Sequence, residues 1–461
     1  MSEKIRSIVF VDCRIRNDVL TFVFEKSKMV DTKEGNGELR MKRIRLFCFG
    51  VLACMLIVMG SAPHKVSAAA FKIGDWEYQK MISDSLVSTG NNARLKKALQ
   101  KAREGKEVTI AYLGGSITEG VGASPNQKCY AEMSWKIFTK KYGTLDNVSF
   151  VNAGMSGTPS PLGAIRYHRD VESKIDGGKG PDILFLEFAV NDKEECTQGG
   201  AYEGLIRRAL KSGSAVVLIF SVFRDNFNMQ DTYIPYGKYY DLPMISIKDG
   251  LKSQFDQPGF SEWFFHDYWH PTNAGHAFMA DCIANLLEKV DWQMAQKDTM
   301  EDVSKIKPYK TDAFEILKML TTHSIKKSNT GKNHEIKKVN AGGFKTKDER
   351  TGIFRFNGKA KFPYSWKHKR KNSNKPLKIK VYCNKFLVVY KLSKNSHTGK
   401  ADIVVDGKKI KTVNGYNKDG WNNARIVLAI NEQSKKVHTI EIRMTKGNRK
   451  KEFTVLAMGY H

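Results

Sequence analysis

Five short segments, in one order along the chain, carry side chains suited to chemistry at an acyl group. They are Gly114 to Thr118, Asn152 to Gly157, Pro181-Asp182 with Ala189 to Asp192, Ile234 to Tyr236 with Leu242-Pro243, and Asp267 to Pro271. Together they supply a serine, donors for an oxyanion and a carboxylate–histidine pair. Acyl transfer through a serine nucleophile requires this set of groups.

Ser116, Asp267 and His270 are the candidate catalytic residues. Asp267 and His270 are three apart, and on one helical turn this spacing puts both side chains on the same side. A carboxylate beside an imidazole fixes the tautomer of the ring and supports the cation that forms when the ring takes the serine proton. Taken alone, Ser116 could equally cap a turn, and His270 could be a buried structural histidine. We expect the neighbouring His266 and His276 to be structural.

The candidate oxyanion donors are the backbone N–H groups of Ser116 and Gly157 and the side-chain amide of Asn191. A tetrahedral acyl intermediate needs donors aimed at the oxygen that becomes charged. Taken alone, Asn191 would be interpreted as a turn former after its strand, because Asn-Asp is a common loop pair.

Apolar runs alternate with amphipathic stretches from about residue 106. The predicted strands are Val108 to Leu113, Val148 to Val151, Ile183 to Phe188, Ala215 to Ser221 and Met244 to Ile247, and the predicted helices are 128–142, 162–174, 201–212 and 272–290. Nearly continuous apolar strands are typical of a parallel sheet covered on both faces, so we predict a doubly wound α/β domain. Such sheets bind ligands at the carboxyl ends of their strands. Because each segment follows a strand or opens the last helix, we expect all five at that edge.

These segments resemble the SGNH hydrolases, a branch of the GDSL esterase-lipase superfamily. The match covers roughly residues 106–290 and includes Ser116, Gly157, Asn191 and His270, with Asp267 as the third member of the triad. One departure is that Gly115 stands where the family usually has an aspartate before the serine. That aspartate is not a triad member, and its loss is expected to affect the shape of the pocket.

The resemblance implies a flavodoxin-like three-layer α/β/α fold and hydrolysis of an ester without a metal or cofactor. Exported relatives often deacetylate polysaccharides, whereas others are lipases or thioesterases. Candidates for lining the acyl pocket are Tyr112, Tyr130, Phe223 and Tyr233, each of which could instead be core or surface.

The beginning of the chain predicts export. Met41-Lys42-Arg43 precedes an apolar run from Leu46 to Met59, and Val66-Ser67-Ala68 follows as a small-residue cleavage site. This layout is that of a secretory signal peptide over 41–68. We expect residues 1–40 to be an upstream extension caused by a start placed too early. The alternative to a secreted or cell-wall-associated protein is one anchored in the membrane through residues 46–60.

Cysteine usage and charge limit the remaining function classes. Cys129, Cys196, Cys282 and Cys383 are widely spaced, which excludes a disulfide scaffold or a zinc site. The formal net charge is +28, and residues 301–461 hold 38 Lys+Arg against 13 Asp+Glu. Residues 351–400 contain 14 basic residues and no acidic one. The charge therefore belongs to the C-terminal third.

The C-terminal third also changes its pattern. Residues 69–105 are expected to lead into an α/β domain over 106–292, and residues 293–350 are expected to be a helix-containing connector. The region 351–461 has short alternating runs, which predict an antiparallel β-sandwich; the runs are 352–356, 377–382, 386–390, 401–405, 425–429, 437–444 and 453–458.

The basic domain predicts an anionic partner. A balance of this size destabilises a domain through self-repulsion, and for an exported protein we expect cell-wall polymers or acidic polysaccharide rather than nucleic acid. Trp366, Tyr382, Tyr390, Tyr416 and Trp421 are candidates for stacking on sugars, or else core residues.

The sequence as a whole predicts a secreted serine esterase that removes small acyl groups, expected to be acetyl, from glycans. One alternative is a lipase or thioesterase that uses the same site. The other is a non-catalytic cell-wall or glycan-binding protein.

Overall fold

The computed structural model describes residues 7–16, 19–28, 71–144, 146–327, 330, 331, 333–350 and 360–461. Strands β1 (Ser7–Arg16) and β2 (Val19–Lys28) pair as an antiparallel hairpin within the expected upstream extension. This hairpin belongs to a unit of its own, residues 1–68, and the rest of the chain forms a second unit. The signal segment 41–68 lies outside the described residues. Among the residues that are described, no helix has the length and apolar character to cross a membrane.

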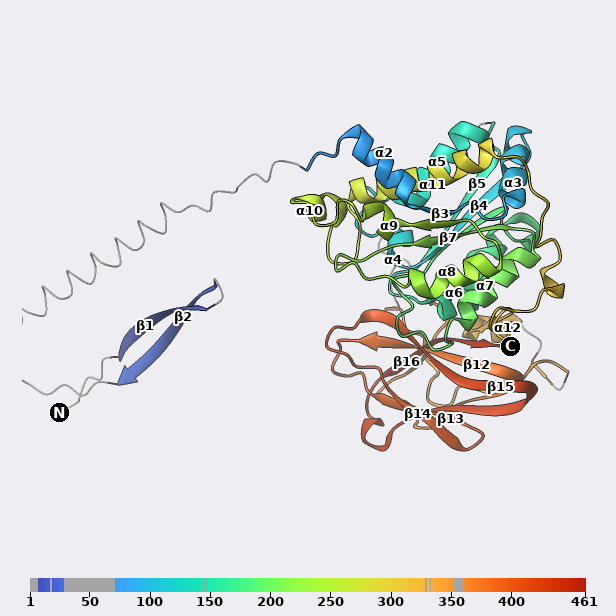
Figure 1. Cartoon of the computed structure of the whole chain (residues 1–461). Helices are drawn as coiled ribbons and strands as arrows, with labels where there is room; N and C mark the ends of the chain where they lie inside the picture. The colour runs from blue at the N-terminus through green and yellow to red at the C-terminus, as the bar shows by residue number, and fades with distance from the viewer. Residues whose placement is uncertain are drawn as a thin grey trace, which may run out of the picture. The chain divides into compact units, whose positions relative to one another are not determined.

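The α/β domain is built on a six-stranded sheet (Figure 1). Five strands are parallel and lie in the order β5 (Val148–Gly154), β4 (Val108–Gly114), β6 (Ile183–Glu187), β7 (Ala215–Phe220) and β8 (Met244–Ser246). Numbered along the chain this is the order 2-1-3-4-5, which is that of flavodoxin-like sheets. All five sequence-predicted strands are confirmed.

Helices cover both faces of this sheet because alternate residues of each strand are apolar on opposite sides. On one face lie α2 (Asp75–Asp84), α3 (Ala93–Arg103), α5 (Tyr130–Tyr142) and α11 (Asn273–Trp292), packed against side chains such as Ile110 of β4. On the other face lie α6 (Ser160–Asp170), α7 (Gly200–Lys211) and α8 (Gln230–Tyr239), packed against side chains such as Leu113. Four of these helices match the predicted ones.

Two boundaries differ from the sequence prediction. Residues 75–103, expected to lead into the α/β domain, are part of it: β3 (Leu86–Ser88) pairs antiparallel with β8 at the edge of the sheet. The expected connector 293–350 contributes β9 (Lys318–Leu320), helix α12 (Thr322–Lys327) and β10 (Ile336–Asn340). β9 and β10 join the second domain, so that domain begins well before residue 351.

The described residues of the second domain, called the β-domain below, form one antiparallel sheet of eight strands. Its path is β11 (Trp366–His368), β16 (Phe453–Tyr460), β12 (Leu377–Ser393), β15 (Trp421–Met444), β13 (Lys400–Val405) and β14 (Lys408–Asn414), with β9 and β10 at its margins. The runs predicted at 377–382 and 386–390 fall in one long strand, β12, and those at 425–429 and 437–444 fall in β15. Irregularities in register between Cys383 and Leu387 interrupt this pairing, and such bulges bend a strand. The predicted run 352–356 lies outside the described residues.

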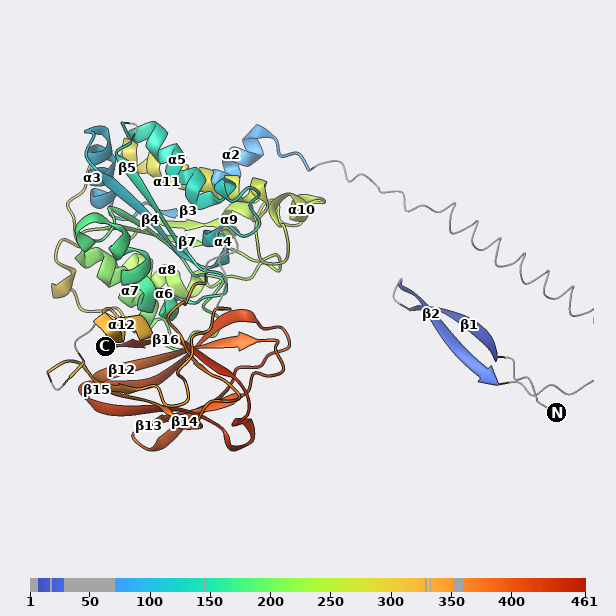
Figure 2. The same cartoon turned by 180° about the vertical axis from the view of Figure 1, so that it is seen from behind.

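The two domains share one hydrophobic core. The cluster around α6 and α7 includes Leu387, Val389 and Leu456 of the β-domain. Gly459 of β16 lies so close to α6 that a Cβ atom there would be 2.4 Å from Ile165. Figures 1 and 2 show the β-domain against the layer of α6 and α7, away from α5 and α11. The β-domain is therefore packed onto the α/β domain through buried side chains.

Candidate active site

Ser116, His270 and Asp267 form a continuous hydrogen-bonded chain at the carboxyl end of β4. His270 Nε2 lies 3.0 Å from Ser116 Oγ, and His270 Nδ1 lies 2.8 Å and 2.9 Å from the two oxygens of Asp267. Ser116 begins the short helix α4 (Ser116–Glu119) directly after β4. These are the contacts that a nucleophile, a base and an orienting carboxylate need.

The prediction that Asp267 and His270 share a helical turn was wrong. Residues 266–269 form a bend, and Asp267 Oδ1 accepts the backbone N–H groups of Trp269 (2.8 Å) and His270 (2.9 Å). An aspartate that accepts the N–H two residues on makes an Asx turn. Burial opposes ionisation of Asp267, but the hydrogen bonds from His270 and the backbone outweigh it, so its pKa lies below the usual value. The carboxylate is therefore charged where the imidazole needs it.

The Gly-Gly turn before Ser116 is required by close packing. A Cβ atom on Gly114 would lie 2.2 Å from Thr118 Oγ1, and one on Gly115 would lie 2.1 Å from Asn191 Oδ1. Asn191 follows β6 and its Oδ1 is buried, with no hydrogen-bond partner in the described part of the chain. Gly115 therefore lets Asn191 approach the Ser116 turn, and an aspartate at position 115 would displace it.

A buried carboxyl group lies beneath this turn. Glu187, the last residue of β6, is fully buried and accepts a hydrogen bond from Thr118 Oγ1 at 3.0 Å. Thr118 Oγ1 also lies 2.8 Å from the hydroxyl of Tyr130. Burial raises the pKa of Glu187 to about 8, which keeps the group largely protonated at neutral pH.

Gly157, the third candidate oxyanion donor, lies beside an aromatic side chain of the β-domain. Gly157 has a φ of +65°, in the left-handed region that favours glycine. A Cβ atom there would lie 2.9 Å from the indole ring of Trp421, the first residue of β15. The β-domain therefore reaches the edge of the site through Trp421, which is 52% exposed.

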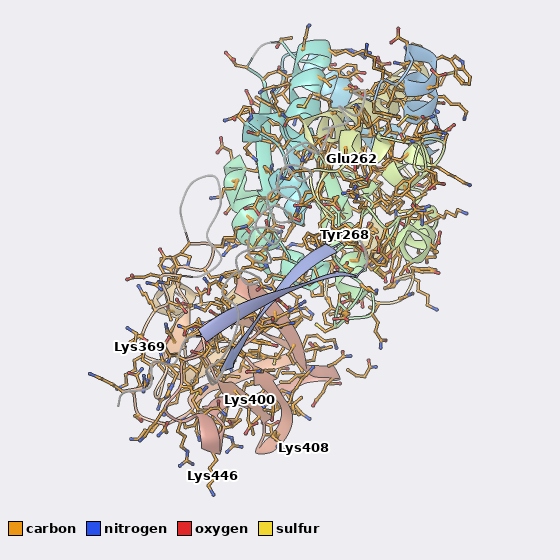
Figure 3. All side chains as sticks on the ribbon, turned by 90° about the vertical axis from the view of Figure 1, so that its left-hand side faces the viewer. Glu262, Tyr268, Lys369, Lys400, Lys408 and Lys446 are labelled. Atoms are coloured by element: carbon orange, nitrogen blue, oxygen red, sulfur yellow. The ribbon has the colours of Figure 1, made fainter. Side chains whose placement is uncertain are left out.

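Two further exposed aromatic residues adjoin His270 and were not singled out from the sequence. Trp269 is 52% exposed with its ring centroid 6.4 Å from that of His270, and Tyr268 is 44% exposed with its centroid 5.4 Å from that of Trp269. Figure 3 labels Tyr268 on the α/β domain. Their position next to the catalytic histidine candidate was the available signal.

The remaining aromatic candidates separate by burial. Tyr112, Tyr130 and Tyr233 are at most 1% exposed and belong to the core, so they do not line an acyl pocket. Among the sugar-stacking candidates, Trp366 is buried and Tyr390 stacks on Phe453 in the core of the β-domain, whereas Tyr382, Tyr416 and Trp421 are exposed. Phe223 is half-buried, with its ring centroid 6.3 Å from that of Tyr268.

The two neighbouring histidines behave differently from His270. His276 is fully buried between the backbone N–H of Tyr130 (3.3 Å) and the carbonyl of Val121 (3.2 Å), and burial lowers its pKa to about 4. It is structural, as expected. His266 is exposed, and its backbone N–H donates to the His270 carbonyl at 2.8 Å, which closes the loop that carries the histidine.

Parts of two predicted segments lie away from the reactive edge. Asp182 precedes β6 and pairs with Lys101 at 2.6 Å, and Leu242-Pro243 precedes β8. Ile234 to Tyr236 lie inside α8. The expectation that every segment follows a strand or opens the last helix is therefore wrong for these three.

Asp192, in contrast, lies at the carboxyl ends of the parallel strands and has a structural role. It is buried, accepts the N–H of Ser160 (2.7 Å) and the hydroxyl of Tyr233 (2.6 Å), and burial raises its pKa to about 7. It thus ties the loop of Asn191 to the start of α6.

A groove of about 740 Å³ in the β-domain has Trp421 among its lining residues. Its basic lining residues are Lys347, Arg350, Lys367, Lys369, Lys391 and Lys394. Two of the acidic residues in it are already paired, Asp348 with Lys391 at 2.5 Å and Glu452 with Lys367 at 2.7 Å. Excess positive charge therefore faces the groove.

Comparisons with known proteins show which solved structures share this fold. No protein-family model and no curated protein matches the chain. Among solved structures, a two-domain esterase (CEX) active on acetylated mannans aligns with 24% identity and a TM-score of 0.68, over 82% of this chain and 98% of its own. This chain has the fold of that two-domain esterase.

Two other solved structures are also similar. The same esterase co-crystallised with mannopentaose aligns with 24% identity and a TM-score of 0.66, over 82% of this chain and 97% of its own. A catalytic variant of Axe2, an acetylxylan esterase from Geobacillus stearothermophilus, aligns over 40% of this chain and 96% of its own, with 16% identity and a TM-score of 0.31.

Proposed function

We propose that this protein is a serine esterase of the SGNH type that removes acetyl groups from a polysaccharide. The observation that carries the proposal is the chain of contacts from Ser116 Oγ through the His270 ring to the Asp267 carboxylate. The fold shared with an esterase active on acetylated mannans supports the same conclusion.

The mechanism follows from the positions of these groups. His270 Nε2 takes the proton of Ser116 as its Oγ attacks the acyl carbonyl, and the Asp267 carboxylate stabilises the imidazolium. The backbone N–H groups of Ser116 and Gly157 and the Asn191 amide donate to the oxyanion. The alcohol leaves with the proton from His270, and a water molecule then attacks the acyl-enzyme by the same route and releases the acid.

A sugar chain is the substrate that the surroundings favour. Trp269 on the His270 side and Trp421 on the Gly157 side are both half-exposed. Indole rings present a large apolar face that can pack on the apolar face of a pyranose while their N–H groups stay solvated. A buried acyl-chain pocket has no comparable support, since Tyr112, Tyr130 and Tyr233 are part of the core.

We also propose that the β-domain holds anionic glycan or cell-wall polymer. Arg350, Lys369 and Lys394 line the groove and are exposed, and no ion pair joins them to an acidic residue of the described chain. Figure 3 labels Lys369, Lys400, Lys408 and Lys446, four exposed lysines of this domain. Sedimentation of the protein with bacterial cell walls should fall steeply between low and high salt, because exposed charges are screened. A K369E/K394E variant should bind the walls less, and retention that ignores both changes would refute this part.

Export is proposed from the sequence alone. Cleavage of a signal peptide near Ala68 would place the new N-terminus just before α2. Mass spectrometry of the protein from the culture medium of producing cells tests it. A mature N-terminus near residue 69 is expected, and a chain that still carries residues 41–68 would support the membrane anchor.

A substrate panel tests the enzyme proposal. Acetate release should be followed on acetylated mannan, acetylated xylan and O-acetylated peptidoglycan, with long-chain nitrophenyl esters for comparison. We expect acetate from at least one polysaccharide and little turnover of long-chain esters. Preference for long-chain esters would establish the lipase alternative, and no turnover of any ester would favour the binding protein.

A further inference from the structure

A buried ion pair joins the two domains behind the oxyanion loop. Glu119, the last residue of α4, is 5% exposed, and Lys361 of the β-domain segment is 6% exposed. Lys361 Nζ donates to Glu119 Oε1 at 2.6 Å and to Oε2 at 2.7 Å. The negative charge of Glu119, three positions after Ser116, is thus balanced by Lys361 from a distant part of the chain.

The same carboxylate holds the residue before Gly157. The backbone N–H of Ser156 donates to Glu119 Oε2 at 2.7 Å, and the Ser156 hydroxyl donates to the same oxygen. Gly157 itself is exposed with a positive φ, so the fixed part of this loop is its neighbour Ser156. The Gly157 N–H belongs to the next peptide, so its direction depends on how Glu119 holds the backbone and side chain of Ser156.

Close packing leaves this carboxylate little freedom. A Cβ atom on Gly154 would lie 2.1 Å from the backbone N of Glu119, so the turn after β5 and helix α4 are in tight contact. Arg166, also buried, donates to the carbonyls of Gly114 (3.0 Å) and Ala153 (2.6 Å) and braces the two strand ends on either side. Because Glu119 has little room to move, we expect loss of its counter-charge to change its hydrogen bonds and not its position.

From these contacts we propose that Lys361 is a positioning residue for the oxyanion hole, acting through Glu119 and Ser156 on the N–H of Gly157. The proposal rests on the proposed esterase function of the Ser116 site. Without Lys361, the buried Glu119 carboxylate would lose its counter-charge and draw in water to compensate. That water competes with the two hydrogen bonds that Ser156 donates to Glu119. The β-domain would then contribute to catalysis by positioning an oxyanion donor, in addition to any role in binding a polymer.

The first test compares two variants that each remove one buried cation. Lys361→Met takes away the partner of Glu119. Arg207→Met is the matched control, because Arg207 lies 3.2 Å from Glu315 and both are at most 5% exposed, at the contact between α7 and the segment that follows α11. On a small acetyl ester, Lys361→Met should lower kcat about tenfold to a hundredfold with KM little changed, as expected for a displaced oxyanion donor. Arg207→Met should keep kcat near the wild-type value even where it lowers Tm.

A double variant separates charge balance from simple packing. Glu119→Gln with Lys361→Met removes both charges and leaves an amide oxygen that can still accept from Ser156. Part of the lost kcat should return relative to Lys361→Met alone. A double variant as slow as the single one, with a native Tm, would show that the charge on Glu119 is not what Lys361 controls.

A second readout needs no activity and keeps this proposal distinct from the enzyme proposal. Hydrogen exchange of the peptide that spans residues 154–158 should become faster in Lys361→Met and stay unchanged in Arg207→Met. Unchanged exchange in folded Lys361→Met would overturn the positioning role whether or not the wild-type protein hydrolyses esters. Faster exchange in a protein without esterase activity would instead leave the contact established and the enzyme proposal refuted.

Discussion

The two domains differ strongly in net charge, but both contribute side chains around the candidate active site. Residues 1–300 carry a net +3, from a total of +28 less the +25 of residues 301–461. The candidate triad lies wholly in the nearly neutral α/β domain. Yet the basic β-domain brings Trp421 to Gly157 and Lys361 to Glu119. A boundary drawn by charge or by secondary structure is therefore not a boundary of function, since side chains from both domains surround the oxyanion loop.

Among substitutions in the two domains, we expect Ser116→Ala to have the largest effect on activity. Loss of the nucleophile should reduce acetate release by about 10⁴-fold or more. The variant should keep its Tm, because Ser116 is half-buried on a turn and, among the described residues, its hydroxyl has a hydrogen bond only to His270. Steady-state kinetics on a small acetyl ester measure it. Residual activity near the wild-type level would move the chemistry away from this serine.

Asn191→Ala should have the next largest effect. Loss of one oxyanion donor costs about 10²- to 10³-fold in kcat in serine hydrolases. Because the buried Oδ1 of Asn191 has no partner among the described residues, its removal should cost little stability. Kinetics and thermal unfolding on the same preparation test both statements. A loss in stability with unchanged kcat would make Asn191 a packing residue.

Trp421→Ala should have a smaller effect, and one confined to polymeric substrates. We expect KM for acetylated polysaccharide to rise about tenfold, which corresponds to about 1.4 kcal/mol of lost contact. Tyr382→Ala is the matched control, since Tyr382 is also an exposed aromatic residue of the β-domain but packs under Lys337. An equal rise in KM in both variants would mean that exposed aromatic residues of the β-domain bind the polymer nonspecifically and that Trp421 does not form a subsite at Gly157.

The last effect is on the pH dependence of stability, not on catalysis, and concerns the α/β domain alone. The folded pKa of Glu187 is raised by burial from 4.5 to about 8. Its stabilising contribution is therefore complete below about pH 4.5 and is lost as pH rises through about 8. Glu187→Gln should flatten this decline in the free energy of unfolding, measured by urea titration from pH 5 to 8.5. Parallel curves for the two proteins would show that Glu187 does not titrate in this range.

The strands and most helices of the α/β domain were predictable because each has a local signature, and the candidate site residues could be proposed from local motifs. The strands of the α/β domain are apolar on both faces, which fixes their type, and the Asp-x-x-His-Pro segment marks Asp267 and His270. The geometry of that pair was predicted wrongly, because spacing alone does not distinguish a helical turn from an Asx turn.

What the sequence could not supply were contacts between distant segments. Trp421 was recognised as a sugar-stacking candidate, but nothing in its neighbourhood predicts that it lies against Gly157. Lys361 is one of many lysines in an acid-free stretch, and contacts with α6, such as the hydrogen bond from Arg169 to the Lys361 carbonyl at 3.1 Å, bring its segment near Glu119. β9 and β10 were missed because they are short and become strands through pairing with β16 and β12.

The most direct test of the account is to locate the nucleophile by covalent labelling. The full chain is treated with a fluorophosphonate, digested, and the modified peptide is identified by mass spectrometry, with Ser116→Ala treated in parallel. We expect one adduct, on Ser116, that disappears in Ser116→Ala and forms more slowly in Lys361→Met. An unlabelled wild-type protein, or an adduct on another serine that persists in Ser116→Ala, would contradict it.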